Sequence, residues 1–300
     1  NGSGKSTVLH ALACLYQPVN DSTRTDFKFP HFFIPTSIDL WNGSQFTIEY
    51  EMIAGAVMVP NTKEYKKNID RWSPRYQTRP RREVFYIGID SCVPDMEIES
   101  RTSRIPLVRE AYDDAVLARK IKEKLSYIMH REYGDFINYW TERKSYKGLV
   151  YKAVQYPSLY MGAGEQRVIK FLEIIYSVPD YSLILIDELD LTLHTEALLR
   201  LMCVLNEECQ TRNIQIVFTS HREELLDCNF INIRHLVNDA NGKTSICLER
   251  TTPDCIKRLT GVCPKPLEIM VEDNLAEALV RKILRVHNLE QSCNVSQFGS

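Results

Sequence analysis

Residues 1–7 read NGSGKST, and this short stretch contains the closing half of a phosphate-binding loop. The full pattern is G-x-x-x-x-G-K-[ST], and Gly4, Lys5 and Ser6 supply its last three positions. The opening glycine, and the buried strand that feeds such a loop, are expected upstream of Asn1. We therefore expect this sequence to be a piece of a longer chain that begins inside the motif.

The chemistry of the loop gives its residues distinct roles. Gly2 and Gly4 let the backbone turn tightly, so that its N–H groups face phosphate oxygens. Lys5 is expected to reach the β/γ-phosphates of a nucleotide, and the Ser6 hydroxyl to ligate Mg²⁺. Apolar residues recur at helical spacing over 7–16, which predicts a helix whose N-terminus favours an anion. The candidate nucleotide-binding residues here are Asn1, Gly2, Ser3, Gly4, Lys5, Ser6 and Thr7. A small-residue turn before an ordinary helix is the alternative.

The composition is that of an ordinary soluble protein. The 300 residues are 44% hydrophobic and 25% charged, with a net charge of −2, enough for one large or two modest domains. No apolar run reaches the roughly 18 residues of a membrane span, so we expect no membrane partner. The nine cysteines form no C-x-x-C pair, which argues against a zinc site and favours a reducing, cytoplasmic location.

A second motif lies at residues 182–194, SLILIDELDLTLH. Its apolar run over 183–186 predicts a strand buried on both faces of a parallel sheet, ending at the carboxyl edge where α/β proteins bind ligands. Asp187 would hold Mg²⁺ through water, and Glu188 would be the general base that activates the attacking water. Two solvated acids at a strand end are the alternative for this motif alone.

A glycine-rich turn precedes this strand, in residues 160–178, YMGAGEQRVIKFLEIIYSV. Apolar residues after it recur at helical spacing, so the turn is expected to lie at a helix N-terminus, which is a second anion site. The order of NGSGKST, GAGEQ and LILIDE resembles that of ABC-type ATPases. The resemblance implies that Gly162, Gly164 and Glu165 face ATP across a dimer, although the usual pattern begins with serine.

Two further segments extend the resemblance. The ending DELDLTLH is similar to the form found in the OLD (overcoming lysogenization defect) family and its AAA relatives. A helix is expected at 195–212 and a strand at 214–221, IQIVFTSH. His221 at the end of that strand resembles a histidine that contacts the γ-phosphate, although a lone histidine is more often structural or solvated.

The segment between the loop and the glycine turn is expected to hold an insertion at about 60–150. Strands are predicted at 27–35, 45–55 and 83–90, and a helical region over about 108–140. Residues 63–82, KEYKKNIDRWSPRYQTRPRR, combine basic and aromatic side chains. Two interpretations of this stretch remain open. It is either a solvated loop or a DNA contact, in which Tyr65, Trp72 and Tyr76 stack bases.

The C-terminal residues predict the start of another α/β unit. After a linker at 251–266, a strand, an acid, an amphipathic helix and a second strand follow one another. This β–α–β start resembles a Toprim domain, with Asp273 where glycine is typical. The resemblance implies that Glu272 is a metal ligand and a catalytic acid/base, and Glu277 a second metal ligand. Two acids near a helix N-terminus are the structural alternative.

We therefore expect an α/β fold, with an ABC-type P-loop ATPase sheet carrying a β-rich and helical insertion (1–250), followed by the start of a Toprim domain (267–300). The resemblance implies an ATP-dependent DNA endonuclease with Mg²⁺ or Mn²⁺ at its nuclease site, acting in anti-phage defence as a homodimer or higher homo-oligomer with other defence components. Three alternatives remain: a RecF/SMC-like DNA-binding ATPase without nuclease activity, the nucleotide-binding domain of a transporter, and an ATPase that regulates a partner effector.

Overall fold

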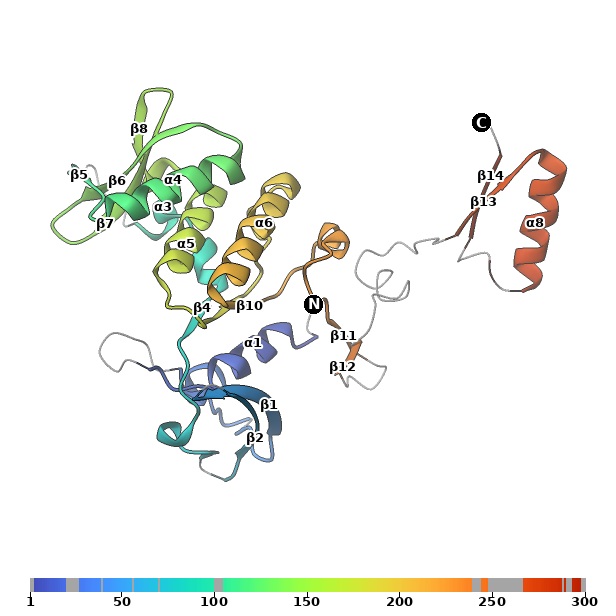
Figure 1. Cartoon of the computed structure of the whole chain (residues 1–300), viewed down its shortest axis with the longest axis horizontal. Helices are drawn as coiled ribbons and strands as arrows, with labels where there is room; N and C mark the ends of the chain where they lie inside the picture. The colour runs from blue at the N-terminus through green and yellow to red at the C-terminus, as the bar shows by residue number, and fades with distance from the viewer. Residues whose placement is uncertain are drawn as a thin grey trace. The chain divides into compact units, whose positions relative to one another are not determined.

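The structure is a computed structural model that describes residues 3–19, 27–38, 40–55, 57–69, 71–99, 105–238, 244–247, 267–287, 289 and 293–297. Its contacts divide the chain into two compact units. The larger unit is Ser6–Ser220, and the smaller one combines Asn1–Lys5 with His221–Ser300. Figure 1 shows the elements of both units.

A parallel sheet lies at the centre of the larger unit. It consists of β4 (Val84–Ile87), β9 (Leu183–Ile186) and β10 (Gln215–Phe218), in the order β10-β9-β4. All four residues of the central strand β9 are buried, as expected for a strand covered on both faces. The strands predicted within 83–90, 183–186 and 214–221 are thus confirmed, and their carboxyl ends meet at one edge.

Helices cover both faces of this sheet. Helix α1 (Lys5–Ala13) packs Leu9 and Ala13 against Leu183 and Leu185 of β9. Figure 1 shows α5 (Ala163–Ser177) and α6 (Thr195–Arg212) on the opposite side of the sheet from α1. The helices predicted after the loop, after the glycine turn and at 195–212 are all present, because each carries an apolar stripe that the sheet buries.

An antiparallel ribbon packs against the end of α1. It contains β1 (Gln45–Ala54), β2 (Val57–Lys67) and the short β3 (Trp72–Ser73). The strand predicted at 27–35 is wrong, because this segment contains the short helix α2 (Phe29–Phe32) with Pro30 in its first turn. Proline has no N–H to lose at that position, and the aromatic rings of this segment pack inside the cluster described next.

The aromatic side chains of 63–82 lie in this cluster. Tyr65 is fully buried, and Trp72 stacks on Phe29 with ring centroids 4.0 Å apart. Arg79 is also buried, and its Nη1 donates to the backbone oxygen of Cys14 at 2.6 Å. Tyr65 and Trp72 are therefore not available to stack bases, because they pack in this cluster. A DNA contact through the exposed basic residues of the stretch stays a prediction. The stretch is also no solvated loop, since it contains the end of β2, β3 and the 3-10 turn η1 (Tyr76–Thr78).

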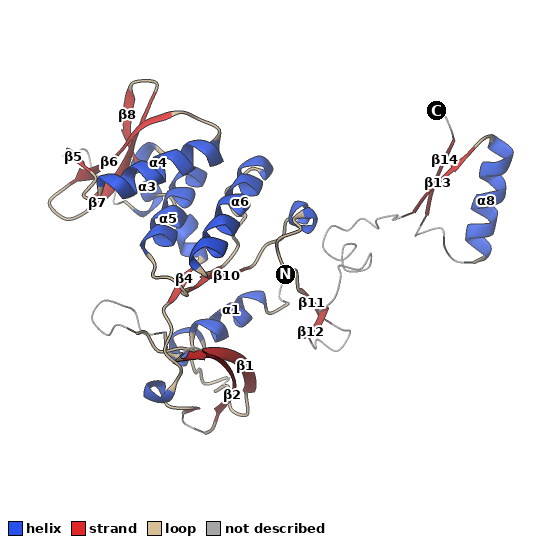
Figure 2. Ribbon diagram, in the orientation of Figure 1, coloured by secondary structure: helices blue, strands red, loops and turns tan. Residues whose placement is uncertain are grey.

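A lobe with an antiparallel sheet follows β4, after the short elements η2 (Ile89–Cys92) and α3 (Asp95–Ile98). Its sheet order is β5-β6-β7-β8, from β5 (Val108–Ala111), β6 (Tyr133–Trp140), β7 (Ser145–Tyr151) and β8 (Val154–Pro157) (Figure 2). Helix α4 (Ala115–Met129) begins at Asp114, which caps it, and ends at His130 in the left-handed conformation. The helical region predicted over 108–140 is therefore wrong at both ends, where strands stand instead.

The smaller unit contains the 3-10 turn η4 (Glu223–Asp227) and the antiparallel pair β11 (His235–Asn238) and β12 (Thr244–Cys247). It also contains β13 (Leu267–Val271), α8 (Asn274–Val286) and β14 (Cys293–Gln297), in which the two strands are parallel. This is the strand–helix–strand order predicted from the sequence. None of the helices that the structure describes is long and apolar enough to span a membrane.

Candidate active site

The carboxyl end of β9 carries the two acids singled out in the sequence. Asp187 is buried, and its N–H donates to the backbone oxygen of Ile87 on β4 at 2.9 Å. Its Oδ1 accepts a hydrogen bond from the Thr219 hydroxyl at 2.6 Å. Because Thr219 directly follows β10, the ends of all three strands meet at Asp187: β4 holds its backbone, and the residue after β10 holds its carboxylate.

Glu188 begins a turn with a strained backbone. Its φ is +52°, in the left-handed region of backbone conformation that residues other than glycine seldom adopt. Its N–H donates to Thr219 Oγ1 at 2.8 Å, and the next N–H, of Leu189, donates to the Thr219 oxygen at 3.0 Å. Such strain persists only where the surrounding contacts fix it, and it is common at functional sites. The contacts of Thr219 thus hold the turn that presents Glu188.

A fully buried arginine reaches the same turn from α5. Arg167 Nη2 donates to the backbone oxygens of Asp187 at 3.0 Å and of Glu188 at 2.6 Å. Burial lowers the pKa of Arg167 to about 10, and the nearby acids Asp190 and Glu188 oppose this effect. Neither Arg167 nor Thr219 belongs to a motif, so neither was among the predicted site residues. The signal was their position, one just after the glycine turn and the other just after β10.

The glycine turn precedes α5 as predicted, and its two glycines differ. A Cβ at Gly164 would lie 2.8 Å from the backbone oxygen of Thr192, so only glycine lets α5 approach the loop after Glu188 this closely. A Cβ at Gly162 would have nothing within 4 Å, and this residue is exposed. Gly164 therefore lies at the close contact between α5 and the loop after Glu188, and Gly162 faces open space.

Glu165 is directed toward the neighbouring lobe. Its buried carboxylate accepts hydrogen bonds from Tyr133 at 2.5 Å, from Arg131 at 3.1 Å and from Tyr156 at 3.3 Å. Its other oxygen accepts from the Gly162 N–H at 3.3 Å. Together with burial, this carboxylate raises the pKa of Tyr133 well above its usual value. Glu165 thus fixes the glycine turn, and its contact with ATP stays a prediction.

The predicted phosphate loop lies at the start of α1. Gly4 has a φ of +85°, which requires glycine, and nothing would lie within 4 Å of a Cβ there. Lys5 is the first residue of α1, and Ser6 and Thr7 continue its first turn. Asn1 and Gly2 lie outside the described residues, while the Ser3 oxygen accepts a hydrogen bond from Thr244 at 3.5 Å. A positive-φ glycine in open space before a helix N-terminus suits a phosphate.

One further histidine lies near Asp187. His10 of α1 lies 2.9 Å from the Tyr86 hydroxyl of β4, measured at Nε2, and stacks on Phe32 with ring centroids 4.5 Å apart. Burial lowers the pKa of His10, against an opposing effect from the Asp187 charge. His10 was not among the predicted site residues, because one histidine in a helix carries no motif.

The remaining predicted residues lie in the smaller unit. His221 is exposed, and Glu272 is exposed directly after β13. Glu277 accepts hydrogen bonds from Arg281 at 2.6 and 2.9 Å and from Gln297 at 2.8 Å, and these bonds lower its pKa. Within the described part of the chain, no cluster of three or more His, Cys, Asp or Glu residues could hold a metal ion.

Comparison with known proteins gives one family match. A family model described as "AAA domain, putative AbiEii toxin, Type IV TA system" matches residues 47–227. This range includes the glycine turn, both acids and Thr219, and it excludes NGSGKST and the β13–α8–β14 segment. No curated protein matches the chain.

Solved structures of SMC ATPases are similar in part. The SMC head domain from Thermotoga maritima is 12% identical, with a TM-score of 0.45 over 83% of this chain and 88% of that one. A structure described as "Structural biochemistry of ATP-driven dimerization and DNA stimulated activation of SMC ATPases" is 12% identical, with a TM-score of 0.37 over 48% of this chain and 89% of that one. An Smc head domain with a coiled coil and joint from Pyrococcus yayanosii is 14% identical, with a TM-score of 0.36, and 28% of its length is covered by 48% of this chain.

Proposed function

The chain belongs to the family of AAA-type ATPase domains, and we propose that it hydrolyses ATP at the carboxyl end of β9. The observation that carries the proposal is the turn at Asp187 and Glu188, whose two acids are fixed by one threonine from the neighbouring strand. The ligand-binding edge of a parallel sheet is where such an activity is expected.

The two acids would have separate roles. Asp187 is buried and engaged by Thr219, so its position is fixed. Glu188 is only half-buried and follows on the strained turn, so its carboxylate can meet a water molecule. In the reaction, Glu188 would accept a proton from the water that attacks the terminal phosphorus of ATP. Its backbone contacts would keep the carboxylate oriented while the proton moves.

The residues present also suit Mg²⁺. This ion binds oxygen ligands and is commonly held by one or two carboxylates together with substrate phosphates, so it needs no large protein cluster. Asp187 and the Ser6 hydroxyl are the ligands we propose. When bound, the ion would neutralise charge on the phosphate oxygens. The sequence motif assigns phosphate contacts to Lys5 and to the backbone at Gly4 as well.

The test compares Glu188→Gln with the unaltered protein and with Glu196→Gln, the same change at an exposed residue of α6. We expect Glu188→Gln to lower kcat by roughly a hundred-fold or more, because the general base is removed. Binding of a fluorescent ATP analogue should persist, and Glu196→Gln should leave both quantities unchanged. Equal hydrolysis in the two variants would exclude Glu188 as the base, and no hydrolysis by the unaltered protein would refute the proposed activity.

We also propose that two copies of the chain meet at the glycine turn. Gly162 is exposed and open, as a backbone that receives a phosphate from another molecule must be. In this arrangement, ATP bound by one copy contacts Gly162, Gly164 and the helix N-terminus of the other. The Glu188→Gln variant, which retains ATP, should elute as a dimer with ATP and as a smaller species without it. An unchanged elution volume would contradict this arrangement.

A nuclease activity is the second candidate, and the β13–α8–β14 segment favours it. Its strands are parallel, and Glu272 is exposed directly after β13, where a catalytic acid of a Toprim domain would stand. The sequence resemblance alone supports membership of the OLD family, DNA as the substrate and a role in anti-phage defence. It also supports the γ-phosphate contact of His221. Plasmid cleavage with Mg²⁺ or Mn²⁺ should be lost in Glu272→Gln and retained in Glu268→Gln, an exposed glutamate of β13. Equal cleavage by both variants would contradict the assignment.

A further inference from the structure

We propose that Arg167 is a positioning residue that ties the glycine turn of α5 to the turn presenting Glu188, so that the geometry of the general base depends on where α5 lies. The inference rests on the proposed ATPase function. Arg167 touches no reacting atom in this role, and it acts through the backbone of Asp187 and Glu188.

The burial of Arg167 is the first support. Its side chain is fully buried, although arginine is rarely buried without an acidic partner. Here Nη2 donates to two backbone oxygens, Nη1 lies 3.5 Å from the Ser91 hydroxyl, and the buried Nε has no hydrogen-bond partner. Burying a partly satisfied guanidinium costs free energy. The nearby acids Asp190 and Glu188 offset part of this cost, and the two backbone oxygens fix where the guanidinium lies.

The turn that receives Arg167 is the second support. The Glu188 oxygen accepts hydrogen bonds from Arg167 and from the N–H of Leu191 at 3.0 Å, while its own N–H donates to Thr219. Thr219 thus fixes the N–H side of the strained residue, and Arg167 fixes its carbonyl side. Without Arg167, the peptide after Glu188 keeps the backbone bonds from Leu191 and to Thr219. It is then held less firmly against rotation toward an unstrained conformation, and the carboxylate would turn with it.

The position of Arg167 on α5 supplies the coupling. It lies one turn after Gly164, whose Cα packs against the Thr192 oxygen at the far end of the same loop. Helix α5 therefore contacts both ends of the 187–193 loop. A shift of the glycine turn, as when a phosphate binds there, would move Arg167 and with it the two carbonyl groups that it holds. Hydrolysis would then depend on occupancy of the glycine turn.

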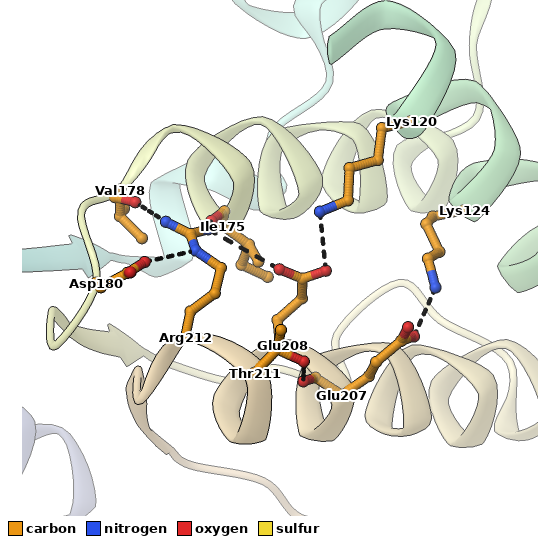
Figure 3. A network of polar contacts seen from close by, with 9 residues as sticks. All are labelled: Lys120, Lys124, Ile175, Val178, Asp180, Glu207, Glu208, Thr211 and Arg212. Carbon is orange, nitrogen blue, oxygen red and sulfur yellow. Dashed lines mark hydrogen bonds and ion pairs between the residues drawn. The ribbon is translucent and has the colours of Figure 1, made fainter. Parts of the chain in front are cut away.

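Arg212 offers a matched control in the same chain. It lies at the end of α6 and also donates to two backbone oxygens, those of Ile175 and Val178 at the opposite end of α5 (Figure 3). It pairs with Asp180 and Glu208 as well, so its role is to close the helix. Replacing either arginine removes hydrogen bonds to two backbone oxygens. Only Arg167 contacts the turn that carries the two acids.

The experiment measures kcat, KM for ATP and melting temperature for Arg167→Lys and Arg212→Lys, well below the melting temperature of both. Lysine keeps the charge but cannot hold the two carbonyls with the fixed fork of a guanidinium. We expect Arg167→Lys to lower kcat by roughly ten- to a hundred-fold with KM changed by less than about two-fold. Arg212→Lys should lower the melting temperature and leave kcat unchanged.

Hydrogen exchange provides a readout that does not need activity. The amides of 188–191 should exchange faster in Arg167→Lys and at the unaltered rate in Arg212→Lys. If the unaltered protein hydrolyses no ATP, the proposed function fails, and this difference in exchange still supports Arg167 as the residue that holds the turn. Equal exchange rates in both variants would overturn the inference, as would a fall in kcat of the same size in both.

A second variant covers the case in which Arg167→Lys does not fold. Phe171 lies one turn further along α5, with its ring centroid 5.1 Å from the Arg167 guanidinium carbon. Phe171→Leu would loosen Arg167 and leave it in the chain. We expect a smaller fall in kcat with KM retained and faster exchange over 188–191. A Phe171→Leu protein with unaltered kcat and unaltered exchange would overturn the inference.

Discussion

Thr219 holds the candidate site together through one hydroxyl group. It donates to Asp187 and accepts from the Glu188 N–H, so its removal leaves a buried carboxylate and a backbone donor without that partner. We expect Thr219→Val to reduce the free energy of unfolding by about 1–3 kcal/mol and to lower kcat, while Thr219→Ser retains both. Denaturant unfolding and steady-state ATP hydrolysis measure the two effects.

The control for Thr219 is Thr211→Val in α6. The Thr211 hydroxyl donates to the Glu207 oxygen at 2.7 Å on an exposed helix surface, where water can replace the lost contact. A loss of stability in Thr211→Val as large as in Thr219→Val would show that the effect is one of losing any threonine hydroxyl.

Tyr133 allows a second prediction about a single group. Its hydroxyl donates to the buried Glu165 carboxylate at 2.5 Å, next to the glycine turn. Tyr133→Phe should lower the free energy of unfolding by about 1–3 kcal/mol, because the carboxylate loses a donor in a buried place. Tyr127→Phe, at an exposed tyrosine of α4, should change it by less than about 0.5 kcal/mol. Thermal unfolding of the two variants side by side decides this, and equal melting temperatures would contradict the prediction.

Single residues with a known motif were predictable, and those without one were not. Asp187 and Glu188 could be proposed because they end an apolar run beside a glycine-rich turn. Thr219 and Arg167 have their roles through hydrogen bonds to backbone atoms far along the chain, and such partners depend on packing that the sequence does not show. The positions of Gly162, Gly164 and Glu165 were predictable, but not the turn of the Glu165 carboxylate toward Tyr133.

At the level of whole elements, the glycine turn sets how closely α5 can approach the loop after β9. Gly164→Ala would place a Cβ 2.8 Å from the Thr192 backbone oxygen, so the loop or the helix must shift. We expect Gly164→Ala to lower the free energy of unfolding by about 1–3 kcal/mol. Gly162→Ala, with open space at its Cβ, should lower it far less. Melting temperatures of the pair test this, and a larger loss in Gly162→Ala would contradict it.

Periodicity predicted elements well where one period dominated. The helix at 195–212 matches α6 at both ends, because its apolar positions face one side and polar residues the other. Over 108–140 the predicted helix is present as α4, and the prediction was wrong at the two ends, where β5 and β6 stand. Strand β6 buries four consecutive residues from Phe136 to Tyr139 and so does not alternate. At 27–35 the many aromatic residues favoured a strand, yet their rings pack around the short helix α2.

For the molecule as a whole, half-buried tyrosines predict how stability changes at high pH. Burial raises the pKa of Tyr86 and Tyr156 to about 12, with nearby acids adding to the effect. An unfolded chain ionises its phenols near pH 10, so the folded state binds more protons above that pH. Stability is therefore fully present below pH 10 and is lost as the pH rises toward 12.

Absorbance at 295 nm and circular dichroism, followed together, test this prediction. The ionisation of Tyr86 and Tyr156 should lie above pH 10 and coincide with the loss of secondary structure. Ionisation of all tyrosines in one step near pH 10, with the secondary structure intact, would contradict it.

The α/β class and the order of motifs were predictable for the whole chain, because each motif lies at a strand end or a helix start. The division into two compact units at 220/221 was not predictable, and neither was the lobe of β5 to β8. Both depend on which segments pack together across long separations in the chain. Family membership covers residues 47–227, and the predicted Toprim start lies beyond that range.

The packing of α1 against β9 also has a consequence for synthesis on the ribosome. Leu9 and Ala13 leave the exit tunnel early, while Leu183 and Leu185, which cover them, are made only after the whole lobe of β5 to β8. The lobe pairs neighbouring strands and can fold as it emerges, but the part of α1 that Leu183 and Leu185 cover stays open until β9 arrives. A nascent chain stalled before residue 183 should therefore recruit chaperones at helix α1.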